Sequence, residues 1–245
     1  MAEHQSIICY VLAILGPIFF MSMQVSFFQT AMKIIRKKSD LKLSPLPFIS
    51  LLTNCAVMSL YAFLRSNATI FCPNFTGFVT GVVCIVVYQQ YTRETKKEFF
   101  FAAAFILLVA FYFAFTGAAY CLGLVGVFLS VVLMGSPLAT LNTVIAEKST
   151  DSLPFMTSVT TFLNALTWSL YGVMEVNDEI VYIPNMIGLF LATVQLCCFC
   201  VYGMPSETPD ESRYTAEQIP NTENTSEGLQ IPLVQNDKKK LQSYA

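Results

Sequence analysis

Residues 183–188 read IPNMIG and open an apolar run, LFLATVQLCCFCVYG, that ends at residue 203. Residues 72–77 read CPNFTG and open a second such run, with Pro, Asn and Gly at the same relative positions. A carboxamide left unsatisfied in hydrocarbon costs roughly 2 to 7 kcal/mol, so an asparagine at either place needs a partner. Because the chain contains this costly motif twice, we expect Asn74 and Asn185 to serve one shared purpose.

The composition is that of a membrane protein. Hydrophobic residues make up 55% of the 245 residues, charged residues make up only 12%, and the mean hydropathy is +0.58. A soluble domain carries about 25% charged residues. The single histidine is at position 4 and the eight cysteines have no companion histidines, so we expect no metal, no cofactor, no catalytic residue and no enzymatic activity.

The hydropathy pattern predicts seven transmembrane helices, since a helix crosses the hydrocarbon core with about 20 apolar residues. Apolar runs of about that length cover residues 7–31, 45–64, 70–91, 99–117, 120–146, 154–174 and 180–203.

The distribution of charge orients these helices. All but one of the 14 basic residues follow the first, third or fifth run or lie in the carboxyl-terminal tail, and Arg65 is the exception. The positive-inside rule then places the amino terminus outside and the tail in the cytosol. An Asn-Ala-Thr sequon makes Asn67, in an outside loop, a candidate for glycosylation. The polar tail, residues 205–245, is expected to be disordered.

The chain also repeats itself at a shift of about 110 residues. The motifs KKSDLKLSPLPF (37–48) and EKSTDSLPF (147–155) share Lys-Ser and Pro-Phe, which matches Pro47-Phe48 with Pro154-Phe155. Asn54 followed by Ser-Leu-Tyr (59–61) matches Asn164 followed by Ser-Leu-Tyr (169–171).

The repeat predicts an all-α fold in which two parallel three-helix repeats are joined by a linker helix (3+1+3). Three crossings reverse the direction of the chain, so one extra crossing is needed to bring both Lys-Ser loops to the same side. We expect a first repeat at residues 1–97, a linker helix at 98–118, a second repeat at 119–204 and the tail at 205–245.

Related positions in the two repeats face each other, so we expect Asn74 and Asn185 to meet across the repeat interface at similar depth. An intramembrane asparagine alone is more often a helix-packing residue. Two that are related by the repeat are better explained as the lining of a polar site. Trp168, the only tryptophan, then offers a flat apolar platform beside them, although it also fits an interfacial aromatic belt.

The predicted cargo is neutral. The seven apolar cores contain no Asp, Glu, His, Lys or Arg, whereas ion-coupled carriers usually need an ionisable group inside the membrane. A carboxamide both donates and accepts hydrogen bonds, which suits hydroxyl groups. The proline residues Pro47, Pro137 and Pro154 flank the Lys-Ser loops and are candidate hinges or ordinary helix caps.

The motifs GSPLATLNTVIAEKSTDSLPF, WSLYG and YIPNMIG, with their weaker echoes in the first repeat, resemble the SWEET sugar transporters, also called the MtN3/saliva family. The resemblance covers residues 15–203, and the chain looks like an animal member of the family. It implies facilitated, bidirectional and uncoupled transport of sugar by alternating access, with a glucose-type monosaccharide as the expected cargo.

The resemblance also implies roles for individual residues. Candidate sugar-binding residues are Asn54, Met58, Asn74, Asn164, Trp168 and Asn185. Tyr61 and Asp178 would form part of an outer gate, and Pro47, Pro137 and Pro154 would belong to a set of four hinge prolines. Phe27 stands where the fourth proline is expected, so helix one is expected to hinge less freely.

Two alternatives share parts of this pattern. A PQ-loop lysosomal amino-acid exporter has the same repeats, but this chain contains no Pro-Gln dipeptide. A seven-helix receptor has the same topology but no internal repeat. We expect a small neutral sugar and membrane lipid as partners, no nucleic acid, and leave self-association open. The expected location is the plasma membrane, with the Golgi apparatus or another endomembrane as the alternative.

Overall fold

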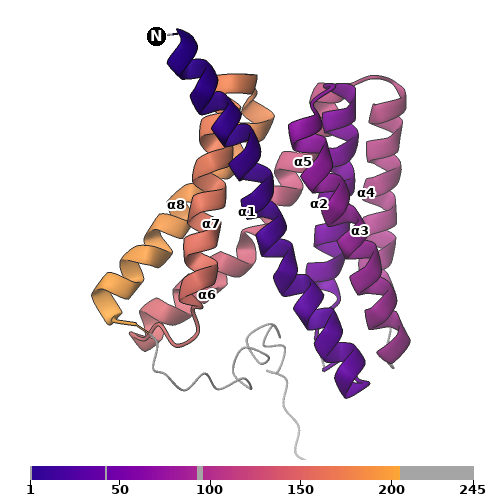
Figure 1. Ribbon diagram of the computed structural model, residues 1–245. Coiled ribbons are helices and arrows are strands. Elements are labelled where there is room, and N and C mark those ends of the chain that lie inside the picture. The colour runs from indigo at the N-terminus through magenta and orange to yellow at the C-terminus, as the bar shows by residue number, and fades with distance from the viewer. Residues whose placement is uncertain (1, 42, 93–95, 205–245) are drawn as a thin grey trace, which may run out of the picture.

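The computed structural model describes residues 2–41, 43–92 and 96–204, and the regular elements in these ranges are all helical (Figure 1). The expected tail, residues 205–245, lies outside the described residues. The helices are α1 (Ala2–Lys37), α2 (Leu46–Leu64), α3 (Ala68–Tyr91), α4 (Lys97–Phe115), α5 (Ala119–Leu133), α6 (Gly135–Glu147), α7 (Phe155–Tyr171), the π-helical turn η1 (Gly172–Val176) and α8 (Glu179–Tyr202).

These elements make the seven predicted crossings. Within the described part of the chain, six spans are long and apolar enough to cross a membrane, and α5 with α6 forms one of them. The remaining crossing is α7, which has 17 residues and is continued by the five residues of η1. At roughly 1.5 Å per residue this pair also reaches across the hydrocarbon core. The all-α, seven-helix fold with its 3+1+3 arrangement is therefore confirmed.

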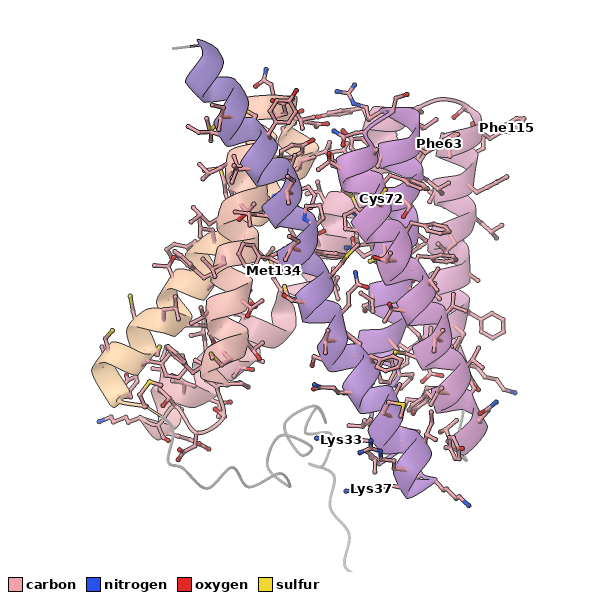
Figure 2. All side chains as sticks on the ribbon, in the orientation of Figure 1. Lys33, Lys37, Phe63, Cys72, Phe115 and Met134 are labelled. Atoms are coloured by element: carbon pink, nitrogen blue, oxygen red, sulfur yellow. The ribbon has the colours of Figure 1, made fainter. Side chains whose placement is uncertain are left out.

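The two ends of the bundle differ in charge. Lys33 and Lys37 lie at the lower end in Figure 2, together with the loops that begin at Lys38 and Lys148. We call this the basic end, and we call the opposite end, where Asp178 begins α8, the Asp178 end. Apolar side chains face outward between the two ends, as the 68% exposure of Phe105 in the middle of α4 illustrates. This surface suits lipid.

Helix packing follows the repeat. In the first half α3 packs against α1 and α2, and in the second half α8 packs against α5, α6 and α7. The halves meet at two equivalent places, where α1 contacts α7 and where α5 contacts α2. The linker α4 lies outside, against α2 and α5 (Figure 1). Equivalent helices thus surround a common centre.

The backbone repeats the symmetry at the Lys-Ser motifs. Lys38 and Lys148 adopt the left-handed conformation, with φ of 49° and 53°, and so end the first helix of each half. The hydroxyls of Ser39 and Ser149 each accept a hydrogen bond from the backbone N–H two residues later, at 3.3 and 3.2 Å. The motif is therefore a helix stop followed by a serine turn.

The prolines that begin α2 and α7 correct the sequence comparison. Pro45 and Pro154 are the N-cap residues of these helices, and their carbonyls accept the first helical hydrogen bonds, from Ile49 and Ser158. Pro47 lies inside the first turn of α2, where a proline breaks no hydrogen bond. Pro45, rather than Pro47, is thus the counterpart of Pro154. The Pro-Phe match therefore pairs Pro47, inside the first turn of α2, with Pro154, which lies just before α7.

The first helices of the two halves differ where the fourth proline was expected. Pro137 has no N–H to offer the carbonyl of Leu133, and α5 ends at Leu133 before α6 begins at residue 135. In α1 the helix continues without a break past Phe27, whose ring packs edge-on against Phe48 at 6.3 Å. That helix one hinges less freely stays a prediction.

We expect Gly81→Ala to destabilise the protein. A Cβ at Gly81 would lie 2.8 Å from the Cα of Leu52, so α2 and α3 would have to separate, at a cost of about 1 to 3 kcal/mol. The matched control is Gly135→Ala, because a Cβ at Gly135 meets nothing within 4 Å. Thermal unfolding of the purified variants in detergent measures the effect, and equal midpoints would contradict the packing described here.

Candidate functional site

A central cavity lies between the two halves of the bundle. Its volume is about 270 Å³, and all six predicted binding residues line it: Asn54, Met58, Asn74, Asn164, Trp168 and Asn185. The first three come from α2 and α3, and the last three come from the equivalent helices α7 and α8. The structure therefore brings the two Pro-Asn motifs to one place.

Asn74 and Asn185 are held in the same way. The Nδ2 of Asn74 donates to the carbonyl of Ile70 at 2.8 Å, and the Nδ2 of Asn185 donates to the carbonyl of Val181 at 2.7 Å. Each bond joins the amide to the backbone four residues earlier in its own helix, which fixes its direction. One N–H and the Oδ1 of each amide remain for another partner. This bonding offsets part of the cost of placing a carboxamide at membrane depth.

Two further polar atoms in the cavity wall are without a partner. The Oδ1 of Asn164 and the Nε1 of Trp168 are buried and have no hydrogen bond. A buried polar group without a bond costs about 1 to 3 kcal/mol. By contrast, the Oδ1 of Asn54, at the equivalent position in the first half, accepts from Ser130 at 3.3 Å. Both atoms belong to α7 in the second half, four residues apart, and neither is accessible to water, so a guest could bond to them only after a small turn of these side chains.

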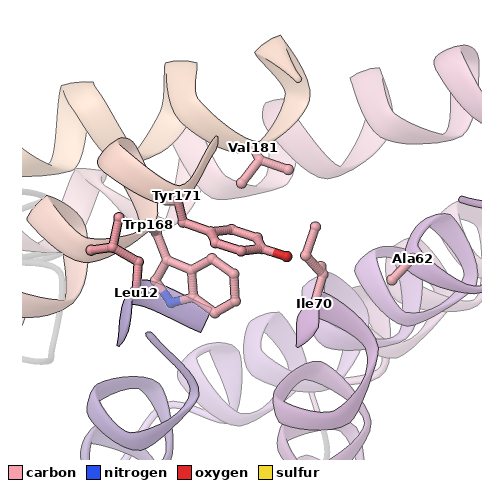
Figure 3. Packing of buried hydrophobic residues seen from close by; sticks show 6 residues of the cluster. All are labelled: Leu12, Ala62, Ile70, Trp168, Tyr171 and Val181. Atoms are coloured by element: carbon pink, nitrogen blue, oxygen red, sulfur yellow. The ribbon is translucent and has the colours of Figure 1, made fainter. Parts of the chain in front are cut away.

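The Trp168 indole lies between α1 and Tyr171 (Figure 3). The ring of Tyr171 meets it edge-on, with centroids 5.6 Å apart. On the other side a Cβ at Gly16 would lie 3.1 Å from the indole ring, so the close approach of α1 requires a glycine there. At the equivalent contact, Gly126 of the second half faces Met58 of the first half, with 2.5 Å from an added Cβ to the sulfur.

Gly16 and Gly126 were not identified from the sequence. They lie 110 positions apart, which is the shift of the repeat, and this correspondence is the signal that would have found them. Each glycine allows the large residue on the opposite half to reach the cavity.

The Asp178 end is closed by a polar contact between the halves. The hydroxyl of Tyr61 donates to Oδ2 of Asp178, and the Nε of Arg65 lies 3.7 Å from the same oxygen. Oδ1 of Asp178 accepts from the backbone N–H of Ile180 and so caps α8. The carboxyl group is buried, so these contacts satisfy it from three sides. The two predicted gate residues are thus in direct contact.

Apolar side chains continue the closure toward the central cavity (Figure 3). This cluster contains Leu12, Ala62, Ile70, Trp168, Tyr171 and Val181. The residues come from α1, α2, α3, α7 and α8, so the cluster joins both halves. It leaves the central cavity shut off from the Asp178 end.

The basic end is open by comparison. A second cavity, of about 450 Å³, extends from Ser44 and Pro47 in the first loop and first turn of α2 to Asn54 and Asn164. It shares five lining residues with the central cavity, including these two asparagines. Pro154 is exposed at the start of α7 and is not part of either lining. The route to the site therefore runs from the basic end.

Asn67, the predicted glycosylation site, is occupied by protein contacts. It is the N-cap of α3, with Oδ1 accepting from the backbone of Ile70 at 3.0 Å. Its Nδ2, the atom to which a glycan would be joined, donates to the hydroxyl of Tyr171 at 3.3 Å. A glycan on this nitrogen would still leave it one N–H, so glycosylation of Asn67 stays a prediction.

The electrostatic character of the site is neutral. Among the described residues that line the two cavities, none is Asp, Glu, His, Lys or Arg. The walls offer amides, hydroxyls, an indole and apolar side chains. Such a site suits an uncharged molecule with several hydroxyl groups, and it contains no acid or base for catalysis.

The comparisons with known proteins identify the family. The family model described as "Sugar efflux transporter for intercellular exchange" matches residues 10–96 and again residues 120–207. The chain belongs to the SWEET family. The double match leaves out the segment that contains α4, in agreement with two repeats and a linker. Parallel repeats are the known arrangement of SWEET transporters, and the family consists of transporters, not enzymes.

Individual SWEET proteins are similar over most of their length. "Bidirectional sugar transporter SWEET2" of Arabidopsis thaliana is 31% identical over 78% of this chain and 86% of its own length. "Sugar transporter SWEET1" of Drosophila pseudoobscura pseudoobscura is 29% identical over 77% of this chain and 87% of its own length. A solved structure of a eukaryotic SWEET transporter superposes with a TM-score of 0.69 at 25% identity, covering 81% of this chain and 98% of that chain.

Gly16→Ala should move the indole in this SWEET protein. The added Cβ would be 3.1 to 3.4 Å from three atoms of Trp168, so the ring has to shift. Because Trp168 is the only tryptophan, a change in the emission spectrum of the purified variant reports the movement directly. Gly126→Ala, which presses on Met58 instead, serves as the control and should leave the emission unchanged. Identical spectra for Gly16→Ala and the parent protein would contradict the packing.

Proposed function

We propose that this protein carries a neutral sugar across a membrane, by facilitated, bidirectional and uncoupled transport. The observation that carries the proposal is the central cavity, which is lined by Asn54, Asn74, Asn164 and Asn185 and, among the described residues, by no charged side chain. The names of the relatives, which include "Bidirectional sugar transporter", support the same activity.

The polar groups match the needs of a sugar ring. Asn74 and Asn185 can each donate to one hydroxyl and accept from another, while Asn164 offers an acceptor and Trp168 a donor. The face of the indole offers an apolar surface to the C–H groups of the ring. Binding would thus satisfy groups that are otherwise left unpaired, which favours a polyol over an apolar guest.

The size of the cavity favours a glucose-type monosaccharide. Pockets for drug-sized ligands measure roughly 300 to 1,000 Å³, and this cavity holds about 270 Å³. Met58, in the place that Trp168 takes in the second half, fills part of the space that a second sugar ring would need.

The absence of charge supports uncoupled transport. Proton and sodium coupling usually require an ionisable side chain within the membrane, and the described residues that line both cavities contain none. The same absence disfavours an amino acid as cargo, since its two charges would remain unpaired. The alternative of an amino-acid exporter therefore has no support from this site.

Alternating access is the proposed mechanism. The contact between Tyr61 and Asp178 closes one end while the cavity is open at the other. Residues 1–97 and 119–204 would rock against each other, with α4 following. The proposed hinges are the break at Met134, one turn before Pro137, the first turn of α2 at Pro47 and the start of α7 at Pro154.

The positive-inside rule supports the proposed orientation. It places the basic end in the cytosol and the amino terminus outside, so the state described here would be open to the cytosol. We propose the plasma membrane as the location, with an endomembrane such as the Golgi apparatus as the alternative.

Uptake of radiolabelled glucose by cells that lack their own hexose carriers tests the function. We expect uptake by the wild type, with no dependence on external pH. Asn74→Ala and Asn185→Ala should each reduce uptake at least tenfold, because each removes several hydrogen bonds worth about 0.5 to 1.5 kcal/mol apiece. Surface biotinylation controls for the amount of protein in the membrane. Full activity of both variants would remove the site, and acceleration by a proton gradient would refute uncoupled transport.

Binding itself is measurable through Trp168. We expect glucose to change the emission of the purified protein in a saturable way, because the sugar would lie against the only indole. Asn185→Ala should weaken the apparent affinity, whereas Phe115→Ala, at an exposed residue on the outer surface of α4, should leave it unchanged. An unchanged emission at all glucose concentrations would contradict stacking at Trp168.

A further inference from the structure

The tyrosines of the two Ser-Leu-Tyr motifs make equivalent contacts across the repeat interface. Tyr61, at the end of the first motif, bonds to Asp178, which is the N-cap of α8. Tyr171, at the end of the second motif, accepts from Asn67, which is the N-cap of α3. Each tyrosine therefore reaches the capping residue of the third helix in the opposite half.

Both capping residues act in two directions. Oδ1 of Asn67 accepts from the backbone of its own helix at 3.0 Å, and Oδ1 of Asp178 does so at 3.1 Å. The second polar atom of each side chain, Nδ2 or Oδ2, bonds to the tyrosine from the other half. The residues just before them, Ser66 and Asn177, share the left-handed conformation, with φ of 49° and 47°. The two contacts are thus built on the same local fold.

The Asn67 contact is next to the proposed sugar site, because its partner Tyr171 packs against Trp168, which lines the central cavity. The ring of Tyr171 extends from α7 toward Ile70 on α3, with its hydroxyl leading (Figure 3). The same ring holds the edge of Trp168 at 5.6 Å. Movement of Asn67 away from Tyr171 would release both the apolar cluster and the ring that supports the indole.

We propose that Asn67 is a gate residue, which with Tyr171 forms a second latch at the Asp178 end, equivalent to Tyr61 and Asp178 but without charge. The proposal rests on the proposed transport function for its purpose, but the latch itself is a property of the closed state. A neutral bond between two rocking units stabilises that state by a small amount, which allows the gate to open again. The latch needs only one N–H of Asn67, which a glycan on the same nitrogen would leave in place.

Four variants separate the latch from capping and from glycosylation. Asn67→Ser keeps a good N-cap but is too short to reach Tyr171. Asn67→Asp keeps the cap and reverses the bond, because the hydroxyl of Tyr171 would then donate to the carboxylate, as Tyr61 does to Asp178. Thr69→Ala removes the sequon and leaves Asn67 in place. Tyr171→Phe removes the partner hydroxyl alone.

The opening of the gate is measured with Val181→Cys, a buried position in the apolar cluster. A thiol reagent that cannot cross membranes is added to intact cells and, separately, to inside-out vesicles. The same proteins without the new cysteine give the background. We expect Asn67→Ser and Tyr171→Phe to raise the rate of labelling from the Asp178 end roughly two- to tenfold, which is the effect of losing one neutral hydrogen bond. The rate of labelling from the basic end should fall, because the protein spends less time open at that end.

The other variants decide between explanations. Thr69→Ala should label at the parental rate, and Asn67→Asp should label at the parental rate or more slowly, because a carboxylate makes the stronger hydrogen bond to the tyrosine. Parental rates for Asn67→Ser on both sides would overturn the latch, and so would a Thr69→Ala protein that behaves like Asn67→Ser. Labelling requires no sugar, so a protein that shows the predicted labelling but no glucose uptake would retain the latch and refute the proposed function. Glucose uptake together with parental labelling rates in all variants would support the proposed function and overturn the latch.

Discussion

The structure depends on one constraint, which is that a polar group at membrane depth has to find its hydrogen bonds inside the protein. Backbone groups meet it by forming helices. Asn74 and Asn185 meet it in part, through bonds to carbonyls four residues earlier in their own helices. The groups that these bonds leave over line a cavity without charged side chains among the described residues, and this is where we propose that a sugar binds.

Duplication turns this local solution into a site with two walls. Each half contributes an amide, a large side chain and a tyrosine, and each half supplies the glycine that lets the opposite large side chain approach. The gate contacts follow the same rule, because each tyrosine bonds to a cap of the other half. The halves are not identical, however. The second half has a break at Met134 where α1 of the first half is continuous. It also has Trp168 where the first half has Met58. We therefore expect the second half to contribute more of the movement and more of the recognition.

Much of this arrangement could be predicted from the sequence. The number of crossings followed from hydropathy, and the pairing of the asparagines followed from the order and spacing of the repeated motifs. Other features depend on distance in space. The match of Pro47 with Pro154 failed because the two loops differ in length, and only the helix starts show that Pro45 is the counterpart. The sequon at Asn67 is a local pattern, whereas its bond to a tyrosine 104 positions away has no local signal.

The central claim is that one sugar molecule binds between the amides of Asn74 and Asn185. An experimental structure of the protein with bound glucose tests it most directly. The account predicts sugar hydroxyl groups within about 3.2 Å of both amides, with the ring lying against Trp168. Glucose bound elsewhere, or amides that turn away from it toward the protein, would contradict the account.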